Sequence, residues 1–175
     1  MCTAFSLLQN LSKDKGNMEE KKRILLNAIM HVKFCIKLCV EQQESGRYFL
    51  FEHPASATSW KLPEMVQLLM RPGVLRVVGH MCAYGMKSQD AEGEGLVKKP
   101  TGWATNSPYI AEQVSQLCSN RWRGAKHRHV HLISGRAKAA EVYPPRLCTA
   151  ILKGLRRQFI ADGIMNARDI GTVCC

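Results

Sequence analysis

Three side chains in the second half of the chain have the chemistry of metal ligands. His127 lies nine positions after Cys118, and His129 follows two positions later. His127, His129 and the neighbouring His131 alternate, so on a strand they would share one face. Thiolates and imidazoles are the groups that bind zinc in proteins. Structural zinc sites usually show tighter, paired spacing, so we favour a second interpretation, in which these histidines accompany arginines in a basic, phosphate-facing segment.

Glu52 and Cys82 are two further candidates for chemistry. Glu52 directly follows the apolar run 48–51 and precedes His53 and Pro54, as at the end of a buried strand. A carboxylate there could act as a general base or accept a hydrogen bond, and a surface acid at a turn is the equal alternative. Cys82 opens a Cys-Ala-Tyr-Gly turn. A nucleophilic cysteine needs a lowered thiol pKa, so we favour a buried structural thiol at this position.

The chain is strongly basic, with a formal net charge of +11. Ten basic residues and a single acid, Glu141, lie between positions 121 and 157. This charge predicts a polyanionic partner, with nucleic acid, DNA above all, ahead of an anionic membrane surface. Trp103 and Trp122 could stack on bases, or could be two core tryptophans. The candidate nucleic-acid contacts are Lys98, Lys99, Thr101, Asn106, Arg121, Arg123, Lys126, Arg128, Arg136 and Lys138.

The cysteines and the hydropathy pattern predict an intracellular protein, nuclear or cytoplasmic. The chain has eight cysteines, but its first residues lack the features of a secretory signal. Cys35 and Cys39 fall within a helical pattern, where cysteine behaves as a small hydrophobic residue. We therefore expect reduced thiols. No apolar run approaches the roughly 20 residues that span a bilayer, so no membrane association is expected.

Helices and strands alternate in the first half of the chain. Apolar residues recur every three or four positions from Met18 to about Glu44, which predicts an amphipathic helix that ends before Gly46. A strand at 48–52, a helix at 60–70 with Pro63 in its first turn, and a strand at 74–81 follow. The order helix, strand, helix, strand predicts a parallel sheet whose strands end at one edge.

The rest of the chain is predicted in less detail. Residues 86–98 are expected to form a mobile loop, 103–106 a short strand, 109–118 a helix, and 146–159 a helix after Pro144 and Pro145. We expect a flexible lead-in over 1–17, a single α/β domain over 18–160 and an irregular tail over 161–175.

Several short motifs follow one another in a particular order: Glu52-His53-Pro54, Cys82-Ala83-Tyr84-Gly85, Lys99-Pro100-Thr101, Thr105-Asn106, Cys118 with His127 and His129, and Tyr143-Pro144-Pro145-Arg146-Leu147-Cys148. This order resembles the carboxyl-terminal half of phage-type DNA cytosine-5 methyltransferases. It also resembles the degenerate form of that segment in Copia-like retroelement polyproteins of the dinoflagellate type. The resemblance covers residues 46–155. It implies a Rossmann-like fold in which Glu52 matches the glutamate that contacts the flipped cytosine, while His53 departs from the family's asparagine.

Two parts of that family's machinery are absent from the sequence. The family binds S-adenosylmethionine through a Phe-x-Gly-x-Gly loop, yet only Gly16 and Gly46 precede Glu52. Its nucleophile is the cysteine of a Pro-Cys motif, and no proline precedes Pro54. Covalent attack is what makes the cytosine ring reactive, so we expect no methyl transfer by this chain alone. S-adenosylmethionine would bind only if a partner chain supplied the missing half.

We therefore predict a partial Rossmann-like α/β fold, with a parallel sheet flanked by helices and a basic C-terminal helical extension. The predicted function is that of a catalytically incomplete, DNA-methyltransferase-like and retroelement-associated domain that binds nucleic acid. One alternative is half of a split DNA cytosine methyltransferase that needs a partner chain. The other is a degenerate gene fragment without activity.

Overall fold

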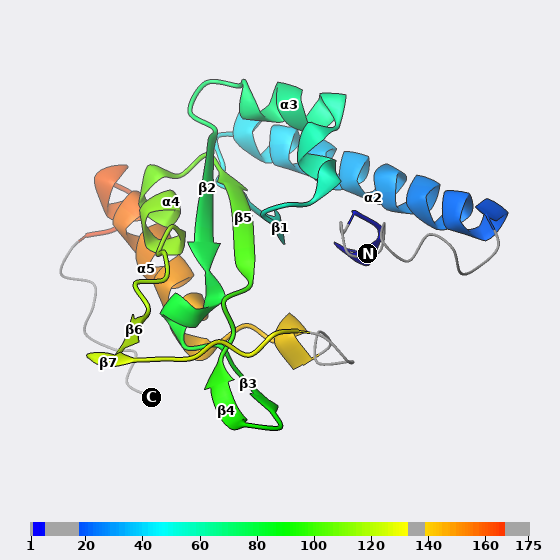
Figure 1. Cartoon of the computed structure of the whole chain (residues 1–175). Coiled ribbons are helices and arrows are strands. Elements are labelled where there is room, and N and C mark those ends of the chain that lie inside the picture. Colours follow the sequence, from blue (N-terminus) through cyan, green and yellow to red (C-terminus); the bar gives the residue numbers. More distant parts are fainter. Residues whose placement is uncertain (1, 6–17, 133–138, 167–175) are drawn as a thin grey trace.

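A computed structural model describes residues 2–5, 18–132 and 139–166 of the protein (Figure 1). The α-helices are α2 (Met18–Glu44), α3 (Pro63–Leu69), α4 (Pro108–Val114) and α5 (Pro145–Ala161). The strands are β1 (Leu50–Pro54), β2 (Leu75–His80), β3 (Lys87–Asp90), β4 (Gly93–Leu96), β5 (Pro100–Thr105), β6 (Arg121–Trp122) and β7 (Ala125–Lys126). Four 3-10 helices, η1 (Cys2–Phe5), η2 (Thr58–Lys61), η3 (Met81–Tyr84) and η4 (Ala139–Glu141), complete the described elements.

The central sheet has the order β1-β5-β2, and both of its strand pairs are antiparallel. Leu50 and Leu75 both lie opposite Thr105, so β1 and β2 run in the same direction but do not pair with each other. The predicted mixture of helices and strands is confirmed, whereas the predicted parallel, Rossmann-like sheet is wrong. The described residues between β2 and β5 contain no α-helix. The chain instead returns through the hairpin β3–β4 to the edge where β2 ended, so β5 enters between the two strands in the opposite direction.

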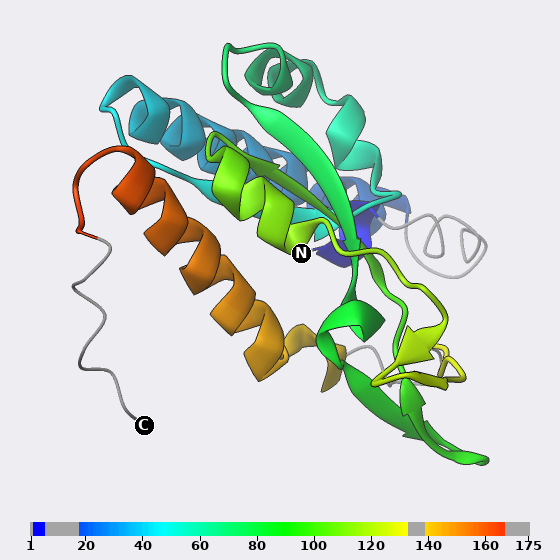
Figure 2. The same ribbon diagram turned by 90° about the vertical axis from the view of Figure 1, so that its left-hand side faces the viewer.

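Helices cover both faces of this sheet, as Figure 2 shows. Successive side chains of β5 point to opposite faces. Ala104 packs into the core beneath α2 and α3, together with Val32 and Leu68. Trp103 packs into a second core beneath α4 and α5, together with Ile110 and Leu147. The sheet thus separates two apolar cores, and every residue of β5 after Pro100 is buried.

The bounds of α2 and α5 follow the sequence closely, whereas α3 begins at position 63 and not 60, and α4 ends at position 114 and not 118. The predicted α2 is confirmed, and Gly46 takes a φ of 68° just beyond its end. Pro63 lies in the first turn of α3, as expected.

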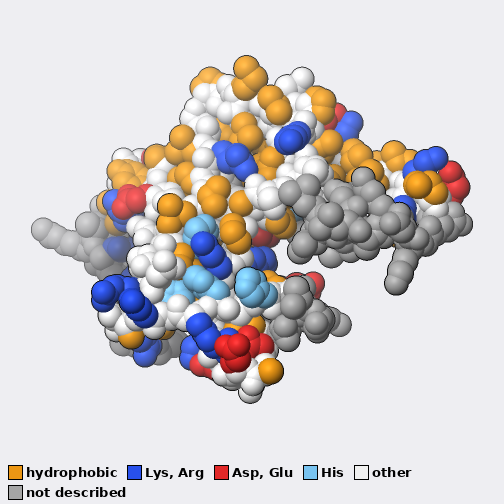
Figure 3. Space-filling view, in the orientation of Figure 1, with side chains coloured by type: hydrophobic (Ala, Val, Ile, Leu, Met, Phe, Trp, Pro, Cys, Tyr) orange, Lys and Arg blue, Asp and Glu red, His pale blue; other side chains and the backbone are white. Residues whose placement is uncertain are grey.

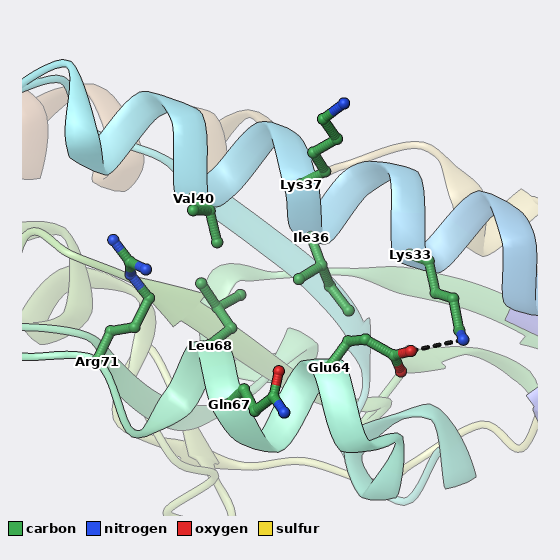
Figure 4. Close-up of a pocket in the computed structure, with 8 residues that line it drawn as sticks. All are labelled: Lys33, Ile36, Lys37, Val40, Glu64, Gln67, Leu68 and Arg71. Atoms are coloured by element: carbon green, nitrogen blue, oxygen red, sulfur yellow. Dashed lines mark ion pairs between the residues drawn. The ribbon is translucent and has the colours of Figure 1, made fainter.

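A groove lies between α2 and α3. The ion pair of Lys33 and Glu64 crosses it, with 2.5 Å between Nζ and Oε1 (Figure 4). Among the described residues, no helix has the length and apolar character needed to cross a membrane.

The predicted loop over 86–98 is wrong, because these residues form the hairpin β3–β4. Gly93 adopts a φ of 99°, which a tight turn between the two strands requires. The predicted strand over 103–106 exists as β5 but begins earlier, at Pro100. The predicted lead-in and tail lie mostly outside the described residues.

Candidate metal centre

Four potential ligands meet beside the end of β2: Cys82, Cys118, His127 and His129. Their ligand atoms all lie within 4.8 Å of one another. Cys118 Sγ is 3.5 Å from Nε2 of His127 and 3.4 Å from Nε2 of His129, and the two Nε2 atoms are 2.9 Å apart. A tetrahedral zinc ion, with bonds of about 2.3 Å to sulfur and about 2.0 Å to nitrogen, holds its ligand atoms roughly 3.3–3.8 Å apart. The cluster therefore has the ligand types, the number and nearly the spacing of a zinc site.

Without a cation, burial favours the neutral forms of Cys82 and His129, so a zinc ion would have to displace the thiol proton of Cys82. Burial, with Cys118 as the next cause, raises the pKa of the Cys82 thiol to about 12. Burial is likewise the main cause that lowers the pKa of His129, and His127 adds to it. Four electron-pair donors thus converge at one point, and a zinc ion would bind them as thiolates and neutral imidazoles. Four protein ligands leave no open coordination position, which is typical of structural rather than catalytic zinc.

Cys82 is held by the turn that directly follows β2. It lies in η3, and the Met81 amide donates to the Lys98 carbonyl at 3.0 Å, which ties this turn to the segment between β4 and β5. Gly85, with a φ of 82°, ends the turn. The predicted burial of the Cys82 thiol is confirmed, since its exposed fraction is 0%. Its place among the ligands was missed by the sequence analysis.

Cys118 is positioned by the segment that follows α4. The Tyr84 hydroxyl donates to the Gln113 carbonyl at 2.8 Å and accepts from the Gln116 amide at 3.1 Å. The Cys118 amide donates to Nδ1 of His80 at 3.0 Å. Side chains of β2 and η3 therefore hold the backbone of residues 113–118 in place, and this brings Cys118 next to Cys82.

The two histidines lie on the strand-like segment after the hairpin β6–β7. The His127 amide donates to the Asn120 carbonyl at 3.2 Å, which closes the base of the hairpin. The Asn120 amide donates to Cys118 Sγ at 3.3 Å. His129 pairs with Leu96 of β4 in an isolated parallel bridge. His127 and His129 point to one side, as the alternation predicts. Arg128 points away and forms two hydrogen bonds of 2.8 Å with the Asp90 carboxylate.

Basic side chains surround the centre. Arg121, Arg123 and Lys126 are exposed on the hairpin β6–β7. Figure 3 shows Lys and Arg side chains gathered over this hairpin, beside the histidines. Lys98 is also exposed, and its charge contributes to lowering the pKa of His80 and of His129, so it lies close to the cluster.

A cavity of about 260 Å³ opens between the hairpin, η3 and the start of α5. Arg123, Arg146 and Lys87 contribute positive charge to its wall, and Lys87 is paired with Glu94. The Arg146 guanidinium lies 4.8 Å from the ring centroid of Trp122, a cation–π contact. Trp122 is therefore half-buried in a basic cavity and does not belong to either apolar core.

Several sequence candidates do not join this basic surface. Thr101 is fully buried and donates to the Lys99 carbonyl. Asn106 binds the backbone of Arg47 and Phe49, at the other end of the sheet. Lys99 is half-buried, and its Nζ donates to the Ala140 carbonyl at 3.0 Å. Arg128 is neutralised by Asp90, and Arg136 and Lys138 lie outside the described residues.

Glu52 lies within β1 rather than at its end, because the strand continues to Pro54. It is half-buried and lies opposite Trp103 of β5. Burial raises the pKa of Glu52, while the Lys99 charge and a hydrogen bond from Tyr143 oppose that rise. The predicted position of Glu52 at a strand end is therefore wrong.

Comparisons with known proteins do not identify the chain: no protein-family model matches it, and searches of curated proteins and of solved structures find no match.

Proposed function

We propose that this protein is a zinc-stabilised domain that binds nucleic acid, with DNA as the expected partner, and that it does not transfer methyl groups by itself. The observation that carries the proposal is the Cys82, Cys118, His127 and His129 cluster at the base of a basic hairpin. Three exposed cations, Arg121, Arg123 and Lys126, lie on that hairpin.

The metal would give this hairpin a fixed shape. Its two strands have only two residues each, and so short a hairpin is unstable alone. Asn120 and Arg123 also adopt positive φ values of 57° and 50°, which are unfavourable for most residues. Cys118 lies before the hairpin and His127 after it, so one ion would close both ends. A surface ordered before binding loses less entropy when its ligand arrives.

The residues beside the centre suit a phosphate backbone and its bases. Guanidinium and ammonium groups bind phosphates, and they supply most of the sequence-independent affinity. The cavity beside the hairpin adds Arg146 and the ring of Trp122. An indole ring next to cations is typical of surfaces that bind single strands, where bases stack on aromatic rings.

The two alternatives have less support. A split methyltransferase would need Glu52 to face a cytosine, but Glu52 is engaged by Lys99 and Tyr143. The assembled ligand cluster and two apolar cores favour a folded domain over a degenerate fragment. The retroelement association stays a prediction from the resemblance.

The test of nucleic-acid binding is a salt series with labelled single- and double-stranded DNA. The triple variant R121A/R123A/K126A should bind more weakly than the wild type. Its log–log salt slope should be shallower by about 2 to 3, since each lost phosphate contact removes about 0.7 to 0.9. The matched control is R47A/K61A/K153A, which removes the same charge from exposed positions on other elements. Equal slopes for the two triple variants, or no binding of folded wild type at low salt, would contradict the proposal.

The test of the metal centre compares two cysteine variants. Wild-type protein purified under reducing conditions should contain one zinc ion per chain by elemental analysis. Cys118→Ser should lose most of this zinc and bind DNA more weakly, because the hairpin loses its anchor. Cys148→Ser removes an exposed thiol outside the cluster and should change neither property. Zinc-free wild type, or equal zinc in both variants, would contradict the metal assignment.

A further inference from the structure

The outer face of α2 carries an exposed apolar stripe. Leu26, Met30, Phe34 and Leu38 are 60%, 67%, 56% and 41% exposed, respectively. Their spacing of four residues places them along one side of the helix. The opposite side holds Ala28, Val32, Ile36 and Cys39, which are buried against the protein. All four side chains of the stripe are therefore exposed, and apolar surface of this kind typically marks an interaction site.

Opposite charges stand at the two ends of the stripe. Arg23 precedes it and Glu41 follows it, and both are exposed. At 3.6 residues per turn, both lie on the same side of α2 as Met30 and Phe34. Arg23 and Glu41 are each nine positions from position 32. The leucines of the stripe are each six positions from it, and Met30 and Phe34 are each two.

This arrangement complements itself under a two-fold rotation. When two α2 helices pair antiparallel about position 32, Leu26 of one copy meets Leu38 of the other, and Met30 meets Phe34. Arg23 of each copy then lies opposite Glu41 of the other, which gives two opposite-charge pairs. In the free chain, Arg23 forms an exposed ion pair with Glu20 on its own helix.

We propose that α2 is a homodimer interface, and that its occupant is the α2 helix of a second copy of this chain in antiparallel orientation. Two features favour a second copy over another partner: the apolar residues are arranged symmetrically about one position, and the charges at the ends are opposite. The pairing seam can run along much of α2, which has 27 residues and is about 40 Å long. The nearby groove between α2 and α3 is a separate feature, since its Lys33 is paired with Glu64 (Figure 4).

The experiment is sedimentation analysis of the purified, nuclease-treated full chain, over a concentration series at a salt concentration that abolishes DNA binding. We expect a monomer–dimer equilibrium. M30E/F34E should raise the dimer dissociation constant by at least 100-fold, because it would bury four like charges in the seam. The matched control V66E/M70E places two acids at exposed apolar positions, one in α3 and one directly after it, and it should leave the equilibrium unchanged.

Charge reversal tests the antiparallel orientation. Measured on nuclease-treated protein at low salt, where exposed charges are least screened, R23E and E41R should each weaken the dimer by about tenfold, because each breaks both ion pairs of the dimer. The combined variant R23E/E41R restores opposite charges and should recover the wild-type dissociation constant. Failure of that recovery would overturn the antiparallel arrangement. A wild type that stays monomeric up to about 100 µM, or M30E/F34E that dimerises like the wild type, would overturn the interface itself.

Discussion

At the scale of single residues, burial decides what His53 does. Only 4% of this side chain is exposed, and its Nδ1 is hydrogen-bonded to the Ser59 hydroxyl. The rings of Phe5 and Phe51 lie edge-on to it, with centroids 5.5 Å and 5.8 Å away. This apolar environment lowers the pKa of His53 to about 4. The histidine that follows Glu52 in the sequence is thus a neutral core residue, and it is not available to a ligand.

The low pKa of His53 predicts a loss of stability in mild acid. As the pH falls below about 6.5, the unfolded chain binds a proton at His53 and the folded chain does not. The free energy of unfolding should therefore decrease by about 3 kcal/mol between pH 6.5 and pH 4, and this contribution should level off below pH 4. Urea titrations across this range measure it. The variant H53N keeps a polar partner for Ser59 and should remove this part of the pH dependence. An unchanged pH dependence in H53N would show that His53 is not its source.

At the scale of elements, the turn η3 packs closely against the hairpin β6–β7 where Gly85 meets the ring of Trp122. Gly85 closes η3 at a φ of 82°, and a Cβ atom at this position would lie 2.7 Å from the Trp122 ring. Since η3 carries Cys82 and the hairpin joins Cys118 to His127, this contact sets how the two halves of the metal centre meet. A glycine is needed here for both its conformation and its small size.

This contact predicts different effects for two glycine substitutions. Gly93 also has a positive φ, of 99°, but a Cβ atom added there would meet no described atom within 4 Å. G93A should therefore cost only the backbone strain, about 1 kcal/mol. G85A should cost about 1 to 3 kcal/mol more, because Trp122 must move. It should also weaken zinc binding, whereas G93A should not. Thermal unfolding and zinc competition titrations measure both effects, and similar results for G85A and G93A would contradict this account.

At the scale of the whole molecule, the sheet separates two regions with different expected roles. The core beneath α2 and α3 supports the proposed dimer interface, whereas the other core lies beneath α4 and α5. The candidate metal centre joins three segments that are distant in the sequence: the turn after β2, the loop after α4 and the segment after β7. A dimer through α2 would carry two basic hairpins. Engagement of one DNA molecule by both would strengthen binding through the raised effective concentration of the second site. For this reason, dimer formation has to be measured on protein that is free of DNA.

The sequence by itself determined the features that depend on near neighbours along the chain. The helical repeat of α2, the proline at the start of α3 and the glycine after α2 all act over one or two turns, and each was predicted correctly. The alternation of His127 and His129 is equally local. The net charge of +11 is a property of composition. It indicated a basic surface, and the hairpin carries exposed cations on that surface.

Only the tertiary structure decided the direction of the strands and which residues meet in the candidate metal centre. A short buried strand has the same apolar pattern in a parallel and an antiparallel sheet. The sequence pattern therefore could not predict that β5 lies between β1 and β2. Cys82 lies 36 positions before Cys118, and no local pattern links them. Arg128 was counted as a nucleic-acid contact because its partner, Asp90, lies 38 positions away on β3. Contacts between distant residues form only when the chain folds, and for that reason the site could be predicted only in part.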